Sequence, residues 1–155
     1  MLDQVYFMAG ALHRHPEVQP EHGFFSVWQG NPPFDGGELM QWTGGLYGQY
    51  EKFFRTSPAP YIVFMRHNPV NAGGGMGMNR SFIVTYGAHG GTDPQEIKFT
   101  LAHEMFHTFQ PMLTAPEEQG GELAASWFNE GLAVFYESAL PLRYGLIDAA
   151  AFLKD

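Results

Sequence analysis

The chain has 155 residues, of which 45% are hydrophobic and 15% are aromatic. A chain of this size and composition can bury enough apolar surface to fold as one ordinary domain, so we expect a single domain over residues 1–155. A complete protein and an excised part of a larger protein both fit this expectation. The formal net charge is −8, which argues against nucleic acid and anionic membrane surfaces as partners.

The chain contains no cysteine. Disulfides and thiolate metal sites are therefore excluded, and a metal ion could be held only by histidine, aspartate or glutamate. No apolar run has the length of a membrane span. The N-terminal stretch has an acidic residue at Asp3 and no basic residue before it, which is not typical of a signal peptide. These features leave the compartment open, because a cytoplasmic and an exported parent protein both fit them.

The first half of the chain predicts strands and one helix. Four segments have the aromatic and β-branched content typical of strands: residues 4–9, 23–29, 61–67 and 80–87. Glycine and proline mark two segments between them as loops, residues 30–37 and 68–79. Residues 37–55 carry apolar side chains at helical spacing and predict an amphipathic helix. Three glycines, Gly44, Gly45 and Gly48, lower the helix propensity of that segment.

The second half of the chain predicts two helices. A suitable N-cap, Asp93, is followed by Pro94 at the first helical position and by Glu96 three residues after the cap. These signals predict a helix over residues 94–109. A second helix should cover residues 122–140 and end at the proline that follows. Strands followed by helices indicate an α+β layout, and we expect a mostly antiparallel sheet packed on the first of the two helices.

The predicted helix over residues 94–109 contains the sequence HEMFH. His103 and His107 are four residues apart, so they lie one turn apart on one face, where both imidazoles can reach a single zinc ion. Glu104 lies about 100° further round the helix, so it flanks a metal-bound water instead of joining the ligands. A carboxylate there can accept the proton of that water as the water attacks a carbonyl. The alternative is two partly buried histidines that hydrogen-bond to their neighbours.

A catalytic zinc site needs a third protein ligand. A histidine six residues after His107 would mark one large class of zinc proteases, but that position is Leu113. Glu130 is the candidate third ligand, because it stands among apolar residues of the second predicted helix, where an unpaired carboxylate would be costly. The alternative is an exposed residue on the polar face of that helix, together with Asn129 and Glu137.

The segments HEMFHTF and WFNEGLAVFYE together resemble the gluzincin metallopeptidases, and among these the glycyl aminopeptidase family is most similar. The similarity extends upstream over the strand YIVFMRH, the loop GGGMGMNRS and the strand FIVTYG, and covers about residues 38–140. It implies a thermolysin-like catalytic domain with Zn2+ as cofactor and a peptide or protein as substrate. It also implies roles for four residues: the ligands His103, His107 and Glu130, and the general base Glu104.

The chain departs from this family at two points. In related aminopeptidases the glycine-rich loop carries a glutamate that receives the free amine of the substrate, and the corresponding position here is Gly77. The family also has a tyrosine or histidine well downstream of the third ligand that stabilises the transition state. Tyr136 and Tyr144 follow Glu130 too closely in the sequence for this role, and we interpret them as packing residues. The absence of the glutamate weakens the case for selectivity towards a free N-terminus.

The glycine-rich loop is the predicted substrate contact. It lacks the lysine and the serine or threonine of a phosphate-binding P-loop, and it lacks the G-x-G-x-x-G order of a dinucleotide fold. We interpret Gly75, Met76, Gly77 and Met78 as a close approach of backbone to substrate. Residues 81–86 would then be a sheet edge that pairs with an extended peptide. The alternative is a turn that only connects two strands.

The other polar and aromatic residues predict no second site. Five histidines have no spacing typical of a further metal centre: His13, His15, His22, His67 and His89. Asn129 and Glu137 are interpreted as exposed helix positions, with a contact to a ligand imidazole as the alternative. The tryptophan and phenylalanine residues near Glu130 are interpreted as core.

These predictions support three hypotheses. The leading one is a zinc-dependent peptidase in which Glu104 activates the attacking water, with an aminopeptidase as one form of it. The second is a zinc-containing domain that binds peptides or a partner without hydrolysing them, which Gly77 and the missing downstream stabiliser motivate. The third is a structural domain without a metal ion. The sequence does not predict the oligomeric state.

Overall fold

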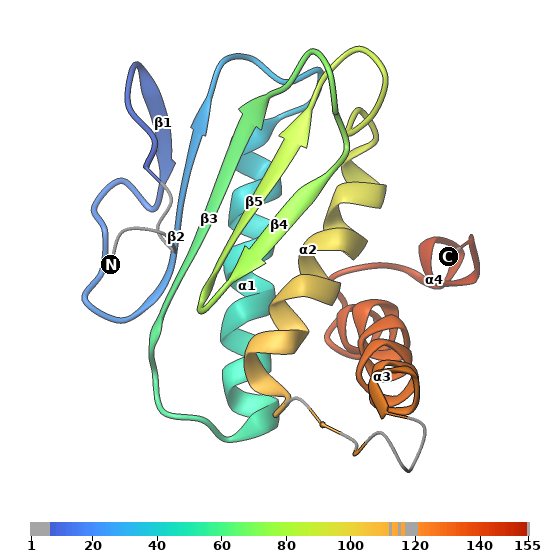
Figure 1. The fold of residues 1–155 in the computed structure, drawn as a ribbon. Coiled ribbons are helices and arrows are strands. Elements are labelled where there is room, and N and C mark those ends of the chain that lie inside the picture. Colours follow the sequence, from blue (N-terminus) through green and yellow to red (C-terminus); the bar gives the residue numbers. More distant parts are fainter. Residues whose placement is uncertain (1–6, 112, 115, 117–120, 155) are drawn as a thin grey trace.

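A computed structural model describes residues 7–111, 113, 114, 116 and 121–154. The described part is an α+β fold with one mixed five-stranded sheet and four helices (Figure 1). The strands are β1 (Leu12–His15), β2 (Gly23–Gln29), β3 (Pro60–His67), β4 (Gly75–Met78) and β5 (Ser81–Tyr86). The helices are α1 (Gly36–Phe54), α2 (Pro94–Phe109), α3 (Gly121–Arg143) and α4 (Ala149–Lys154). The predicted α+β class is therefore confirmed.

The sheet has the strand order β1-β2-β3-β5-β4 and is not mostly antiparallel, so that prediction is wrong. The three central strands β2, β3 and β5 run parallel, and only the outer strands β1 and β4 pair antiparallel with their neighbours. The reason lies in the connections. Helix α1 carries the chain from the end of β2 back to the start of β3, which is the crossover that a parallel pair requires. The central strand β3 pairs with β2 and β5, and the buried strand predicted for residues 61–67 is buried only at alternate residues, with Arg66 and His67 exposed.

Two strand predictions change at the margins of the sheet. Of the predicted strand over residues 4–9, residues 4–6 lie outside the described residues and residues 7–9 are in no strand. The antiparallel neighbour of β2 is instead β1, a short segment without an apolar pattern. The predicted loop over residues 68–79 contains β4, which pairs with β5. Residues 81–86 are therefore not a sheet edge, and β4 occupies that position among the described strands.

Helix α1 forms despite its glycines because its start is capped and one glycine allows close packing. The side chain of Asp35 accepts a hydrogen bond from the backbone nitrogen of Glu38 at 2.9 Å. A Cβ atom at Gly44 would lie 2.9 Å from Cδ1 of Phe24, so the absence of a side chain lets the helix approach β2 closely. The helix ends at Arg55, which has left-handed backbone angles.

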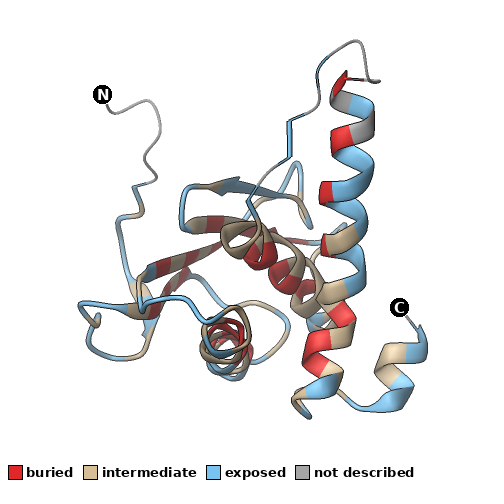
Figure 2. Ribbon diagram, turned by 90° about the horizontal axis from the view of Figure 1, so that it is seen from below, coloured by how far each residue is buried: buried red, intermediate tan, exposed pale blue. Residues whose placement is uncertain are grey.

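The core lies between one face of the sheet and the helices α1 and α2, which Figure 1 shows side by side behind the strands. Alternate residues of β2, β3 and β5 point into it. In Figure 2 the buried residues gather where the helices and the sheet face each other. The largest fully buried side chains include Tyr47, Tyr50, Tyr61, Phe82, Leu101, Met105 and Phe106.

Helix α3 packs along α2, and its buried residues lie on the side that faces the rest of the molecule (Figure 2). It begins close to the predicted position but continues through Pro141 to Arg143, so the predicted end at that proline is wrong. Proline removes only one backbone donor, and the last turn is held by a bond from the backbone nitrogen of Leu146 to the carbonyl of Pro141 at 2.9 Å. No described helix has an apolar stretch long enough to cross a bilayer.

Candidate metal centre

Helix α2 places the two histidines of HEMFH next to each other. Its start is fixed as predicted, because the side chain of Asp93 accepts a bond from the backbone nitrogen of Gln95 at 2.8 Å and Pro94 follows the cap. The rings of His103 and His107 are 5.0 Å apart between centroids. The opposite face of α2 is buried in the core. The helix thus presents both imidazoles on the side that faces α3.

Glu130 of α3 meets these imidazoles across the gap between the two helices. Its Oε2 atom lies 3.1 Å from Nε2 of His103 and 3.5 Å from Nε2 of His107. One ligand atom from each of the three residues lies within 4.8 Å of the others. The Glu130 side chain is 50% exposed, so it is not embedded among apolar side chains as predicted. Glu130 still has the position of a third ligand, because its side chain points towards the two histidines of α2.

Glu137 is bound to the other nitrogen of the first histidine. Its Oε2 atom lies 2.6 Å from Nδ1 of His103, and its side chain is 15% exposed. The prediction of an exposed helix position is therefore wrong, and the alternative, contact with the imidazole, is correct. The hydrogen bond that His103 donates to Glu137 is the main reason that the pKa of His103 is raised, while partial burial acts in the opposite direction. Glu137 follows Glu130 by seven residues, two helical turns, and this spacing was the available signal.

The chemistry of these atoms fits a bound cation. When the Nδ1–H group of a neutral His103 donates its hydrogen bond to Glu137, the Nε2 atom carries a lone pair. That lone pair faces a carboxylate oxygen of Glu130 at 3.1 Å, so two acceptors meet. A proton or a metal ion between them removes the repulsion. Two imidazole nitrogens and one carboxylate are a donor set that several divalent transition metals accept, zinc among them.

Glu104 lies beside this group without belonging to it. Partial burial is the main reason that its pKa is raised, and Glu130 adds to this effect, whereas the imidazoles of His103 and His107 act in the opposite direction. Glu104 lines two hollows, one of about 260 Å³ shared with His107 and one of about 320 Å³ shared with His103. It is therefore adjacent to open space next to each of the two histidines.

Strand β4 passes close to Glu104. A Cβ atom at Gly77 would lie 3.2 Å from Oε2 of Glu104, so the backbone of β4 approaches this carboxylate directly. Gly77 and Met78 line the smaller hollow together with Glu104. Gly75 and Met76 line neither of the two hollows. The structure thus brings half of the predicted substrate segment to the candidate site.

Asn129 is buried, although the sequence suggested an exposed position. Its side chain accepts a hydrogen bond from the backbone nitrogen of Leu113 at 3.0 Å and donates one to the carbonyl of Leu113 at 3.1 Å. Only 3% of the residue is exposed. The amide therefore joins α3 to the chain segment that follows α2. No signal in the sequence predicted this, because the partner is backbone.

The aromatic residues near Glu130 are mostly exposed, so their interpretation as core is wrong. Trp127 is 79% exposed and Phe135 is 59% exposed. Tyr136 behaves as predicted, since its ring stacks on Phe106 at 5.1 Å between centroids. Within the described part of the chain, His103, His107 and Glu130 are the group of residues suited to a metal ion. His13 lies outside this group and stacks on a tryptophan of β2.

The fold was compared with known proteins. No protein-family model and no curated protein matches this chain. Among solved structures, an aminopeptidase N family protein from Idiomarina loihiensis is similar with a TM-score of 0.69 and 20% sequence identity. The similarity covers 94% of this chain and 27% of that chain, so this chain spans about a quarter of the length of that protein. The chain therefore has the fold of one segment of an aminopeptidase N family protein and carries, within that fold, a His/His/Glu group that could hold a metal ion.

Proposed function

We propose that the protein is a zinc-dependent peptidase of the gluzincin type with a thermolysin-like catalytic domain. The observation that carries the proposal is the meeting of His103, His107 and Glu130 within 4.8 Å, beside the carboxyl group of Glu104. These three residues would hold the zinc ion. When bound, zinc would supply a Lewis acid that polarises a peptide carbonyl and lowers the pKa of a water molecule. The similarity to an aminopeptidase N family protein supports the proposal at the level of the fold.

Glu104 is the proposed general base. Glu104 lines both hollows, one together with His107 and the other together with His103, so a water and a peptide carbonyl have room to approach it. Glu104 accepts the proton of the attacking water and then passes it to the nitrogen of the departing amine, so that the amine leaves as a neutral group. Glu137 holds the ring of His103 in the orientation that directs Nε2 towards Glu130.

Strand β4 is the proposed guide for the substrate backbone. It is an outer strand among the described strands, and an extended peptide can add to such an edge through main-chain hydrogen bonds. Gly75 and Gly77 place no side chain on one face of this strand, and Met76 on the other face is 62% exposed. Because Gly77 lies against Glu104, a peptide on this edge has its backbone next to the proposed base.

A second candidate function is a zinc-containing domain that binds peptides without hydrolysing them. Two observations favour it. Gly77 offers no carboxylate for a substrate amine, and among the described residues neither hollow beside Glu104 is lined by a tyrosine that would stabilise an oxyanion.

The two functions are separated by assaying the zinc-loaded chain with a pool of quenched fluorescent peptides, with and without a chelator. The peptidase proposal expects chelator-sensitive cleavage, and expects Glu104→Gln to lose at least a hundredfold in kcat while it retains stoichiometric zinc. The control is Glu38→Gln, an exposed carboxylate on α1 that contacts neither hollow. Cleavage by Glu104→Gln at the wild-type rate contradicts the mechanism. Zinc binding with no cleavage supports the binding domain. Peptides with free and acetylated N-termini distinguish an aminopeptidase from an endopeptidase.

A further inference from the structure

The smaller hollow beside the proposed metal site has two walls. One wall is the hairpin between β4 and β5, residues 77–81, and the other is formed by Glu104, His107 and Thr108 of α2. The hollow has a volume of about 260 Å³, which suits one side chain or one chain terminus of a peptide. An inference about what it holds rests on the proposed function, since the hollow shares Glu104 and His107 with that site.

Among the described residues that line this hollow, Arg80 is the one with a permanent positive charge. Glu104 lines the opposite wall, and in the proposed mechanism its charge serves the attacking water. The edge strand contributes no charge at Gly77. A longer side chain at this position would crowd Glu104, because a Cβ atom at Gly77 would already lie 3.2 Å from Oε2 of Glu104. The group left to bind a charged part of a substrate is therefore the guanidinium of Arg80.

The position of Arg80 is fixed by the hairpin. Its backbone has a φ of 57°, in the left-handed region that a tight turn requires, and its carbonyl accepts a hydrogen bond from the backbone nitrogen of Ile62 at 3.0 Å. Its side chain also influences the titration of Tyr47. Burial is the main reason that the pKa of Tyr47 is raised to about 12, and Glu51 adds to it, whereas Arg80 acts in the opposite direction.

The charge of Arg80 is not taken up by an ion pair within the described residues. No described carboxylate oxygen lies within 4.0 Å of its nitrogens, although Glu104 lines the same hollow. A guanidinium presents paired N–H donors that match the two oxygens of a carboxylate.

We propose that Arg80 selects substrates that carry a carboxylate next to the scissile bond, on the side that enters the hairpin hollow. The carboxylate can belong to an aspartate or glutamate side chain or to the C-terminus of a short peptide. Arg80 is thus a specificity residue. It would favour a negatively charged group of the substrate. An acidic residue at position 77 would instead have favoured a positively charged substrate amine.

The experiment uses the zinc-loaded protein and three sets of matched peptides that differ in the carboxylate alone. One set ends in a free carboxylate, one is amidated, and one is amidated with a single glutamate moved along the peptide. We expect kcat/KM to be about tenfold higher for one of the two carboxylate sets than for the neutral set, in keeping with one charge-assisted hydrogen-bonded pair. The set that is preferred identifies the source of the carboxylate.

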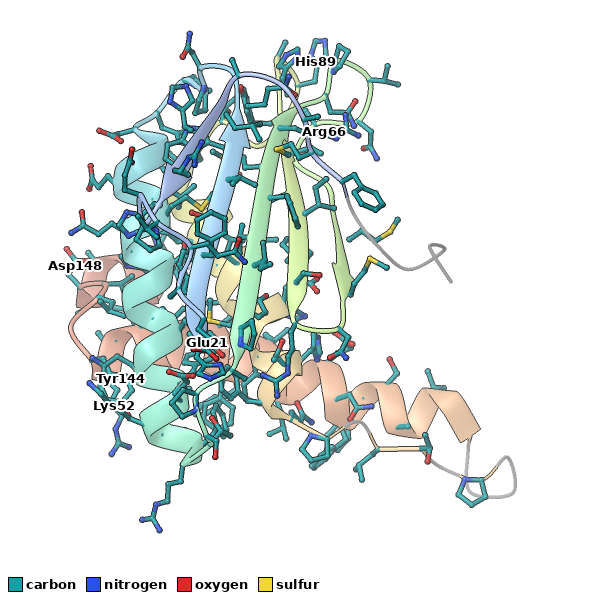
Figure 3. The ribbon with its side chains drawn as sticks, turned by 90° about the vertical axis from the view of Figure 1, so that its left-hand side faces the viewer. Glu21, Lys52, Arg66, His89, Tyr144 and Asp148 are labelled. Atoms are coloured by element: carbon teal, nitrogen blue, oxygen red, sulfur yellow. The ribbon has the colours of Figure 1, made fainter. Side chains whose placement is uncertain are left out.

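The decisive variant is Arg80→Gln, in which the ratio of kcat/KM between acidic and neutral peptides should fall to about one. Arg80→Lys keeps the charge without the paired donors and should retain part of the ratio. Arg66→Gln is the control, because Arg66 is exposed at the opposite end of the sheet from the hairpin (Figure 3) and should leave the ratio unchanged. An equal ratio in wild type and Arg80→Gln, or no preference in wild type, overturns the inference while the peptidase proposal stands.

If no peptide is cleaved, the peptidase proposal fails and the inference is decided by binding. The same peptides are then titrated calorimetrically into the zinc-loaded wild-type protein and into zinc-loaded Arg80→Gln. Tighter binding of a carboxylate set by wild type, lost in Arg80→Gln, supports the inference on its own. Equal binding of all sets, or binding of none, overturns it.

Discussion

The Nδ1 atom of His103 lies 2.6 Å from Oε2 of Glu137, so a carboxylate anchors this proposed metal ligand. Glu137 follows the proposed ligand Glu130 by two helical turns. Replacing Glu137 by Gln substitutes a weaker neutral acceptor for the carboxylate and makes the imidazole a poorer ligand. We expect the affinity for zinc to fall by about 10- to 100-fold. Competition with a chromophoric chelator measures this change, and Glu38→Gln is the control. An unchanged affinity would mean that Glu137 does not orient His103 towards the ion.

Asn129→Ala should destabilise the protein, because it leaves the backbone nitrogen and carbonyl of Leu113 without their partner. Loss of a buried side-chain partner costs about 1–3 kcal/mol in the free energy of unfolding. Urea denaturation followed by circular dichroism measures it. Ser126→Ala changes an exposed side chain of the same helix and should stay within about 0.5 kcal/mol of wild type. Equal stabilities of the two variants would show that the hydrogen bonds to Leu113 contribute nothing.

Zinc should stabilise the folded chain, because the proposed ligands come from two helices that meet only in the native state. At a free zinc concentration of about 100 times Kd, the free energy of unfolding should rise by about 2.7 kcal/mol. Calorimetric scans with zinc and with a chelator give the shift. Glu130→Gln removes the proposed carboxylate ligand and should lose most of it. A shift that persists in full in this variant would place the bound ion elsewhere.

Leu101→Ala tests the core on the face of α2 opposite the histidines. Leu101 is fully buried, so the truncation removes packed atoms and leaves a cavity, and we expect a loss of about 2–5 kcal/mol. Leu153 of α4 is 83% exposed and Leu153→Ala is the matched control, with an expected change below about 0.5 kcal/mol. Chemical denaturation of both variants decides the point. Similar losses in both would show that α2 is not packed as described.

Two glycines of α1 should respond in opposite directions to alanine. At Gly44 the new Cβ would lie 2.9 Å from Phe24, so Gly44→Ala should destabilise the protein by about 1–3 kcal/mol. At Gly48 nothing lies within 4 Å of the new Cβ, so Gly48→Ala should stabilise it by about 0.4–1 kcal/mol through the higher helix propensity of alanine. Melting temperatures of the pair rank them. The reverse order would contradict the packing of α1 on β2.

The features that the sequence predicted well depend on contacts between near neighbours. Asp93 and Pro94 predict the start of helix α2, and helical periodicity alone predicts that His103 and His107 lie on one face of it. The parallel pairing of β2 with β3 was missed because it depends on how α1 crosses over, which no local pattern encodes. Strand β4 was missed because its four residues include two glycines and gain strand geometry only by pairing with β5.

Within the candidate site, the residue types were predictable but their surroundings were not. Glu130 was selected for burial among apolar neighbours, yet Trp127 and Phe135 point to solvent and Glu130 reaches the site by its direction. Asn129 and Glu137 were placed on the surface because polar helix residues usually lie there. Their burial depends on a backbone segment and an imidazole from other parts of the chain, and such partners are visible only in three dimensions.

The division of the His/His/Glu group between two helices has a consequence for folding. His103 and His107 are in place as soon as α2 is helical, whereas Glu130 follows His107 by 23 residues and arrives only when α3 docks. A chain with α2 alone offers two nitrogen atoms and binds an ion weakly. Tight metal binding therefore requires that the two helices have docked. The rate at which the refolding chain binds the metal ion then measures when α3 packs on α2.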